Sequence, residues 1–224
     1  MLHHVVDPPR RPGPEPHPAV VFLHGRGANE HDLRGLLPAL DPRLFSVSVR
    51  APLPFPFGGG FTWYDVQEVG IPGREQFHES LALLRDFLDK GLGHYPIDPE
   101  RVYFLGFSMG AVMASTIGLT EPRRAAGIIA HSGYAPPAAP LGLHFDRGGA
   151  SGKPWLVAHG VLDAVIPVQH ARETRDLLTA AGTDLEYHEY PFGHWVGEES
   201  LRDVSAWLER RLGPGAPQGG RGGV

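Results

Sequence analysis

Short, continuous apolar runs alternate with segments of helical periodicity along most of this 224-residue chain. Residues 19–23 form one such run, which is typical of a strand buried on both faces of a parallel sheet. Because parallel strands need long crossover connections, the alternation predicts an α/β fold with a mostly parallel central sheet and helices on both faces. Further strands are predicted over residues 45–49, 101–105, 127–130, 155–158 and 185–190.

The segments between the apolar runs carry the spacing of amphipathic helices. The clearest helix is predicted over residues 74–88, where large apolar side chains recur on one face. Four prolines between residues 50 and 73 exclude a regular element from that stretch. Further helices are predicted over residues 30–40, 111–119, 171–181 and 199–212.

The length and composition favour one globular unit. A chain of this size can bury one substantial core, so we expect a single α/β domain over residues 1–213. Residues 1–18 form a Pro-rich N-terminal lead of that domain. Residues 214–224 are almost entirely glycine and small or polar residues, which predicts a disordered tail.

Charge and residue usage exclude several classes of partner. The formal net charge is -5 and no long basic run occurs, so the electrostatics do not favour nucleic acid. The absence of cysteine excludes disulfides, thiolate metal sites and a cysteine nucleophile. No apolar run approaches the roughly 20 residues that cross a bilayer, and the N-terminus lacks the apolar core of a secretory signal. We therefore expect a cytoplasmic monomer or homodimer without stable membrane insertion.

The segment Gly106-Phe-Ser-Met-Gly110 matches the motif G-x-S-x-G and lies between a predicted strand and a predicted helix. That context is typical of the nucleophile elbow of the α/β-hydrolase fold. Side chains two residues before and after the serine would collide with neighbouring backbone, which explains both glycines. Ser108 also begins a helix, whose N-terminus favours the negative charge that develops on nucleophilic attack. Ser108 is therefore the candidate nucleophile.

A serine nucleophile needs a base, and the base needs an acid that fixes its orientation. Asp163 follows the predicted strand 155–158, and His194 follows the predicted strand 185–190 by a short turn. Either residue alone fits an ordinary turn aspartate or a surface histidine. Their joint order after Ser108 is the order of the α/β-hydrolase fold, so we expect Asp163 as the acid and His194 as the base.

The loop after the first central strand reads Leu23-His-Gly-Arg-Gly27, and this loop supplies the second oxyanion donor in enzymes of this fold. The expected oxyanion hole consists of the backbone N–H groups of Arg26 and Met109, the latter following the nucleophile. His24 is interpreted as a buried structural histidine.

Together, these motifs resemble those of the phospholipase/carboxylesterase family, which is close to the acyl-protein thioesterases among the α/β-hydrolases. The resemblance runs from about residue 19 to residue 212, and it implies the same triad and oxyanion residues and hydrolysis without a metal or organic cofactor. Two residues depart from the thioesterase pattern, in which Leu usually replaces Arg26 and Gln usually replaces Met109. The motifs that carry the resemblance are Leu23-His-Gly-Arg-Gly-Ala-Asn29, Trp63-Tyr-Asp65, Gly106-Phe-Ser-Met-Gly110, Ser132-Gly-Tyr134, His159-Gly160 with Asp163, and Gly193-His194.

Large aromatic residues near the predicted site suggest an apolar acyl pocket. Phe57, Phe61 and Trp63 lie in the loop after the strand 45–49, and Trp195 follows the expected base. We expect these four residues to bind substrate. The alternative is that the loop rings only cover the core. With few charges in this region, short to medium acyl esters, including lysophospholipids or thioesters, are the expected small-molecule substrates.

Several other functions share these features. An acyl-protein thioesterase, a serine peptidase and a catalytically inactive binding protein can all be built on the same fold. A metal hydrolase is set aside, because the 13 histidines include no H-E-x-x-H or comparable ligand spacing. The sequence therefore predicts a serine carboxylesterase with no metal and no cofactor, acting through an acyl-enzyme intermediate.

Overall fold

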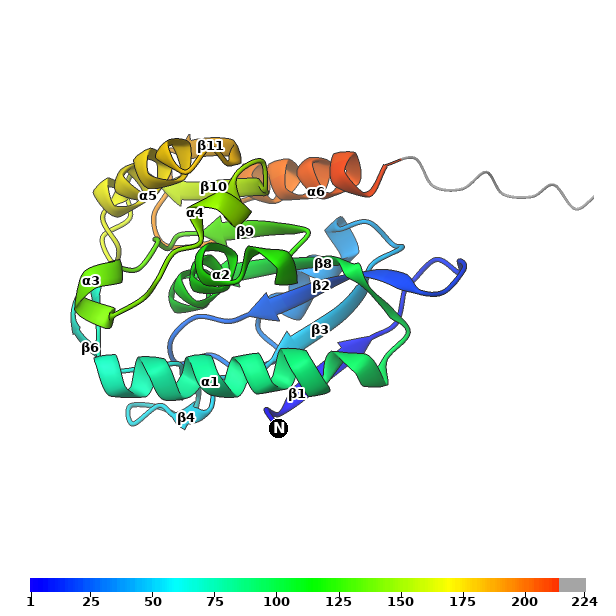
Figure 1. Ribbon diagram of the computed structural model, residues 1–224, viewed down its shortest axis with the longest axis horizontal. Coiled ribbons are helices and arrows are strands. Elements are labelled where there is room, and N and C mark those ends of the chain that lie inside the picture. Colours follow the sequence, from blue (N-terminus) through cyan, green and yellow to red (C-terminus); the bar gives the residue numbers. More distant parts are fainter. Residues whose placement is uncertain (214–224) are drawn as a thin grey trace, which may run out of the picture.

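A seven-stranded sheet forms the centre of the computed structural model, which describes residues 1–213 (Figure 1). The strand order is β1-β3-β2-β8-β9-β10-β11, and all neighbours are parallel except β1 and β3. The predicted α/β fold with a mostly parallel sheet is therefore confirmed. The strands are β1 (His4–Asp7), β2 (His17–Leu23), β3 (Phe45–Val49), β8 (Ile97–Phe107), β9 (Gly127–His131), β10 (Pro154–Gly160) and β11 (Asp184–Tyr190).

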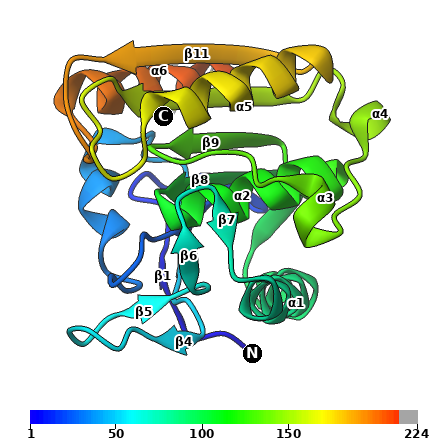
Figure 2. The ribbon, with the colours of Figure 1, turned by 90° about the vertical axis from the view of Figure 1, so that its left-hand side faces the viewer.

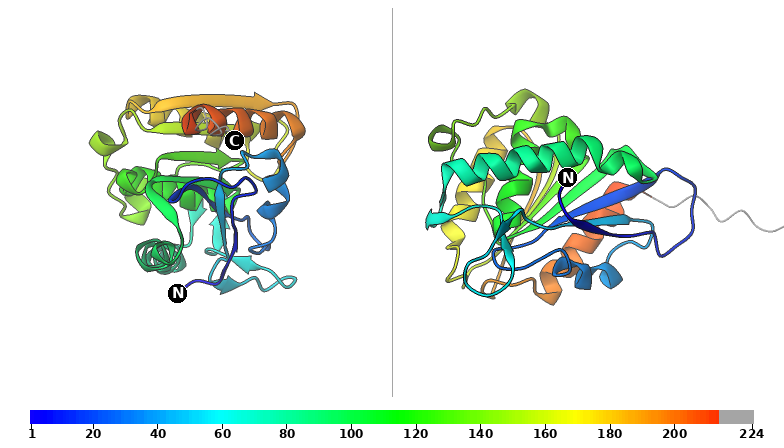
Figure 3. Two further views of the ribbon diagram at one scale, coloured as in Figure 1. Left: turned by 90° about the vertical axis from the view of Figure 1, so that its right-hand side faces the viewer. Right: turned by 90° about the horizontal axis from the view of Figure 1, so that it is seen from below.

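Helices cover both faces of the sheet, as Figure 3 shows. On one face lie α1 (Arg74–Lys90), α2 (Met109–Thr120) and α5 (Val168–Ala180). The other face is covered by α6 (Glu198–Leu212) and by the 3₁₀ helix η1 (Leu33–Ala39). The short helices are η2 (Leu92–His94), η3 (Pro122–Arg124), α3 (Ala138–Leu141) and α4 (Arg147–Ala150).

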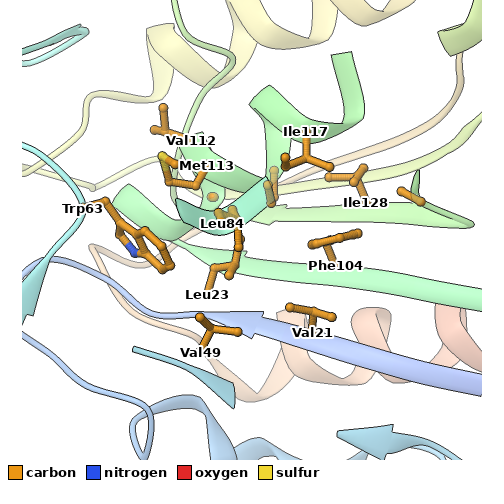
Figure 4. Packing of buried hydrophobic residues seen from close by; sticks show 14 of the residues in the cluster. Val21, Leu23, Val49, Trp63, Leu84, Phe104, Val112, Met113, Ile117 and Ile128 are labelled. Atoms are coloured by element: carbon orange, nitrogen blue, oxygen red, sulfur yellow. The ribbon is translucent and has the colours of Figure 1, made fainter. Parts of the chain in front are cut away.

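The central strand β2 shows why its sequence is apolar at every position. Successive side chains of a strand point to opposite faces. Val21 and Leu23 accordingly join the cluster beneath α1 and α2, where Figure 4 shows them beside Phe104. Val20 and Phe22 join the cluster beneath α6 and η1. Burial on both faces therefore accounts for the continuous apolar run.

Two sequence predictions about secondary structure are wrong. The helix predicted over residues 30–40 is only the 3₁₀ helix η1, which contains Pro38; proline removes a backbone donor and clashes with the preceding turn of an α-helix. The stretch 50–73 does contain regular elements. These are two antiparallel pairs of short strands, β4 (Leu53–Pro54) with β5 (Phe61–Thr62) and β6 (Val66–Glu68) with β7 (Ile71–Pro72). Each strand of such a pair has a neighbour on one side only. A proline is tolerated where its missing N–H would face the side without a neighbour.

The small hairpins lie on the side of the molecule where the parallel strands end (Figure 2). The N-terminal lead also contains a strand that the sequence did not reveal, because β1 has only four residues. The predicted disordered tail, 214–224, lies outside the described residues. Within the described part of the chain, no helix is both long and apolar enough to cross a membrane.

Candidate active site

Ser108 stands at a strained turn between β8 and α2. Its φ of 54° lies in the left-handed region, which side chains rarely adopt and which recurs at functional sites. A side chain at position 106 would meet the backbone of Gly110 and Ala111, and a side chain at position 110 would meet the backbone of Leu23. The close approach of these backbones therefore requires both glycines. The turn is held by the N–H of Ser108, which donates to the carbonyl oxygen of His131 at 2.9 Å.

Asp163 and His194 lie on two neighbouring loops that follow β10 and β11. The Val161 N–H donates to the carbonyl oxygen of Tyr190 at 2.8 Å, and the Leu162 N–H donates to that of Phe192 at 3.0 Å. These bonds join the two loops directly after the parallel pairing of β10 and β11 ends. The acid and the histidine are thereby brought together although they are 31 residues apart in the sequence.

Ser108, His194 and Asp163 form one hydrogen-bonded line. The Nε2 atom of His194 lies 2.9 Å from Ser108 Oγ, and its Nδ1 atom lies 2.7 Å from Asp163 Oδ2. The other carboxylate oxygen, Oδ1, accepts the N–H groups of Val165 and Ile166, each at 2.8 Å. The carboxylate is fully buried. In this arrangement Nδ1 carries the proton and Nε2 is free to accept the serine proton.

The two expected oxyanion donors are the backbone N–H groups of Arg26 and Met109. Arg26 and Met109 both line the cavity that contains the serine. Within residues 1–213 neither backbone N–H has a protein acceptor. The loop that carries Arg26 is fixed by the Gly27 N–H, which donates to the Phe61 carbonyl oxygen at 2.8 Å. Both N–H groups are therefore available to a negatively charged oxygen.

His24 is confirmed as a buried structural histidine. The residue is 2% exposed, and its Nε2 atom accepts the Ala51 N–H at 3.0 Å. Its Nδ1 atom lies 2.7 Å from the Gly25 carbonyl oxygen. The ring thereby ties the loop after β2 to the end of β3.

A cavity of about 120 Å³ opens beside Ser108. Its wall contains two tyrosines, Tyr64 and Tyr134, and most of the remaining wall is aliphatic. Burial raises the pKa of both tyrosine hydroxyls, so both phenols stay neutral. The aliphatic residues are Val66, Val69, Val112, Val165 and Ile166.

None of the four aromatic residues predicted to bind substrate lines this cavity. Trp63 has no exposed surface, and its Nε1 donates to the His24 carbonyl oxygen at 3.0 Å, so it belongs to the core. Phe61 packs under the Arg50 guanidinium at 4.4 Å. Phe57 is 79% exposed, and Trp195 is 55% exposed and stacks on Phe192. The four rings therefore lie outside the wall of this cavity, because the packing of a loop decides where its side chains point.

Sequence reasoning identified Ser108, Arg26 and Met109 but missed the tyrosines and aliphatic residues that line the rest of the cavity. Tyr64 and Tyr134 both occur in motifs that carried the family resemblance, Trp63-Tyr-Asp65 and Ser132-Gly-Tyr134. That signal could have identified them as candidates. Val165 and Ile166 follow the candidate acid in a turn, and no periodic pattern distinguishes them. Among residues 1–213, no group of three or more acidic, histidine or cysteine side chains could hold a metal ion.

A mostly parallel sheet, a serine on a strained strand-to-helix turn and a hydrogen-bonded histidine and aspartate together define a hydrolase of the α/β-hydrolase fold. The model of the phospholipase/carboxylesterase family matches residues 3–212. The chain therefore belongs to the phospholipase/carboxylesterase family.

Similar proteins carry names that are consistent with this family. The chain is 28% identical over 217 residues to acyl-protein thioesterase 1 of Candida albicans, an alignment that covers 85% of this chain and 90% of the relative. Among solved structures, it resembles a Bacillus cereus carboxylesterase with a TM-score of 0.82 and 23% identity, covering 94% and 95% of the two chains. The esterase PE8 has a TM-score of 0.80 and 27% identity, covering 92% of this chain and 97% of its own.

Proposed function

We propose that this protein is a serine carboxylesterase that hydrolyses short to medium acyl esters through an acyl-enzyme intermediate. The observation that carries the proposal is the continuous hydrogen-bonded line from Ser108 Oγ through His194 to Asp163, with contacts of 2.9 and 2.7 Å. A serine, a base and an orienting acid in this arrangement are what nucleophilic catalysis of acyl transfer requires. The proposed substrate is a small-molecule ester.

The reaction follows from the roles of these groups. Ser108 Oγ attacks the ester carbonyl carbon while His194 Nε2 takes the serine proton, and Asp163 stabilises the imidazolium that forms. The N–H groups of Arg26 and Met109 donate to the carbonyl oxygen as it becomes negative. The alcohol leaves with the proton from His194. A water molecule, activated by the same imidazole, then attacks the acyl-enzyme and releases the carboxylic acid.

The size and chemistry of the cavity support the preference for short to medium acyl groups. The space beside Ser108 is about 120 Å³, and it is bounded mainly by aliphatic side chains and two neutral phenols. An acyl chain that fits there gains from the removal of apolar surface from water, roughly 25 cal/mol per Å². A chain longer than the cavity gains nothing further inside it.

Kinetics on p-nitrophenyl esters from acetyl to palmitoyl test this proposal. We expect kcat/KM to be greatest for short or medium chains, and Ser108→Ala to lower kcat by about 10⁴- to 10⁶-fold. A fluorophosphonate probe should label Ser108 in the wild-type protein. A steady rise in kcat/KM to the longest chain would overturn the substrate preference, and turnover that survives S108A would overturn the mechanism.

Thioester hydrolysis is a second candidate, favoured by the relative named acyl-protein thioesterase 1. The same triad can cleave either bond, because both reactions pass through an acyl-enzyme. Comparing an oxygen ester and a thioester with the same acyl group separates the two activities. The monomer or homodimer state, the cytoplasmic location and the single-domain boundary stay predictions from the sequence.

A further inference from the structure

His159 is a buried titratable residue that the proposed reaction does not use. It lies at the end of β10, and its side chain has no exposed surface. Its Nε2 lies 2.8 Å from the Ile166 carbonyl oxygen, which can only accept, so Nε2 carries the proton and donates. The same Nε2 atom lies 3.3 Å from Asp163 Oδ2. Its Nδ1 atom is buried without a partner among the described residues.

The turn that presents Asp163 is held by the buried side chain of Ile166 and by hydrogen bonds around the acid. Several of its side chains point to solvent, with Leu162 68% and Val165 55% exposed, so little apolar packing fixes the turn from outside. From inside, the Ile166 N–H donates to Asp163 Oδ1, and the Ile166 carbonyl oxygen accepts from His159. His159 therefore connects the end of β10 to Ile166, at the far side of the turn, and Asp163 lies between these two residues in the sequence.

The charge state of His159 suits this arrangement. Burial lowers the pKa of its imidazole, an effect that its hydrogen bond to Ile166 and the nearby Asp163 oppose only in part. The ring is therefore neutral near pH 7. A neutral donor holds the turn while leaving the full negative charge of Asp163 to stabilise the imidazolium of His194.

We propose that His159 is a positioning residue of the active site, whose imidazole fixes the 163–166 turn so that Asp163 Oδ2 stays within hydrogen-bond distance of His194 Nδ1. This inference rests on the proposed function, in which Asp163 orients the base. His159 does not line the cavity beside Ser108. Its loss should therefore affect kcat and leave substrate binding, and with it KM, nearly unchanged.

Three substitutions separate the donated hydrogen bond from simple filling of space. In His159→Phe the ring remains but the donor is lost. In His159→Gln the amide nitrogen lies about as far along the side chain as Nε2, so it can reach Ile166. In His159→Asn the amide lies near the position of Nδ1 and falls short. The matched control is His131→Gln on the adjacent strand, because His131 is equally buried but bonds Ser132 and Ser200 instead.

Displacing the acid by a fraction of an ångström to one ångström can cost up to about 10²-fold in rate. We therefore expect H159F and H159N to lower kcat by about 10- to 100-fold on a short p-nitrophenyl ester, and H159Q to recover most of this loss. In a protein that also carries Asp163→Ala, H159F should lower kcat no further, because the residue it positions is gone. The control H131Q should change kcat by the same factor in both backgrounds.

The low-field ¹H NMR resonance of the proton between His194 and Asp163 gives a readout that does not depend on turnover. It should be sharp in the wild type and in H159Q, and broadened or shifted in H159F. Folded H159F with wild-type kcat and an unchanged resonance would overturn the inference, as would an equal loss of kcat with and without D163A. Failure of the proposed function is a separate result, because it would appear as a wild-type protein that cleaves no ester.

Discussion

Tyr134 is one of two residues, with Val69, that line two neighbouring spaces. It lines the 120 Å³ cavity beside Ser108, and it also lines a groove of about 500 Å³ between the Val69–Ile71 segment and α5. The ring is 6% exposed and packs on His170, with a centroid distance of 5.3 Å. Because Tyr134 is the larger of the two shared residues, we expect its ring to limit how far an acyl chain can extend from the serine.

Replacing Tyr134 by alanine should join the two spaces. We expect the ratio of kcat/KM for octanoyl over butanoyl p-nitrophenyl esters to rise roughly tenfold, because a pocket that admits more methylenes discriminates against them less. The control Tyr134→Phe keeps the ring and should keep the wild-type ratio. An unchanged ratio in folded Y134A would show that Tyr134 does not limit chain length.

At the scale of elements, the strand-to-helix turn around Ser108 depends on how closely α2 approaches β2. A Cβ atom at position 110 would meet the Leu23 carbonyl group, which belongs to a central strand and cannot move freely. The turn therefore places the serine only if position 110 has no side chain.

Gly110→Ala should lower the free energy of unfolding by about 1–3 kcal/mol or more, because the added methyl forces the helix away from the strand. Urea unfolding measures this change. The matched control is Gly35→Ala, where nothing lies within 4 Å of the added atom. It should change the free energy of unfolding by no more than about 0.5 kcal/mol. Equal effects of G110A and G35A would contradict the close approach.

At the scale of the whole molecule, buried histidines make folding stability depend on pH. Burial lowers the pKa of His131 to about 3, and burial also lowers the pKa of His159. The unfolded chain binds these protons near pH ~6.5. Protonation therefore favours the unfolded chain, so the contribution to stability is complete above about pH 6.5 and is lost as the pH falls toward the folded-state values.

His131 should contribute a slope of up to about 1.4 kcal/mol per pH unit to the free energy of unfolding between roughly pH 6 and pH 4, and His159 should add a slope of the same sign. Urea titrations at pH 7, 6 and 5 measure this slope. Replacing His131 by phenylalanine should remove the part of the slope that His131 contributes. The same change at the exposed His144 should keep the wild-type slope. A slope that H131F leaves unchanged would contradict the contribution of His131.

Local patterns in the sequence determined the sheet, the principal helices and three candidate catalytic residues. A doubly buried strand must be apolar at every position, and a sharp strand-to-helix turn must have glycines around its serine, so both requirements appear within a few adjacent residues. Only the tertiary structure decided which side chains surround the serine. Tyr64, Tyr134 and Ile166 come from three distant segments, and Trp63 turned into the core while its neighbour Tyr64 reached the cavity. The direction of a loop side chain depends on what packs against it from elsewhere in the chain, and that information is not contained in any local stretch of sequence.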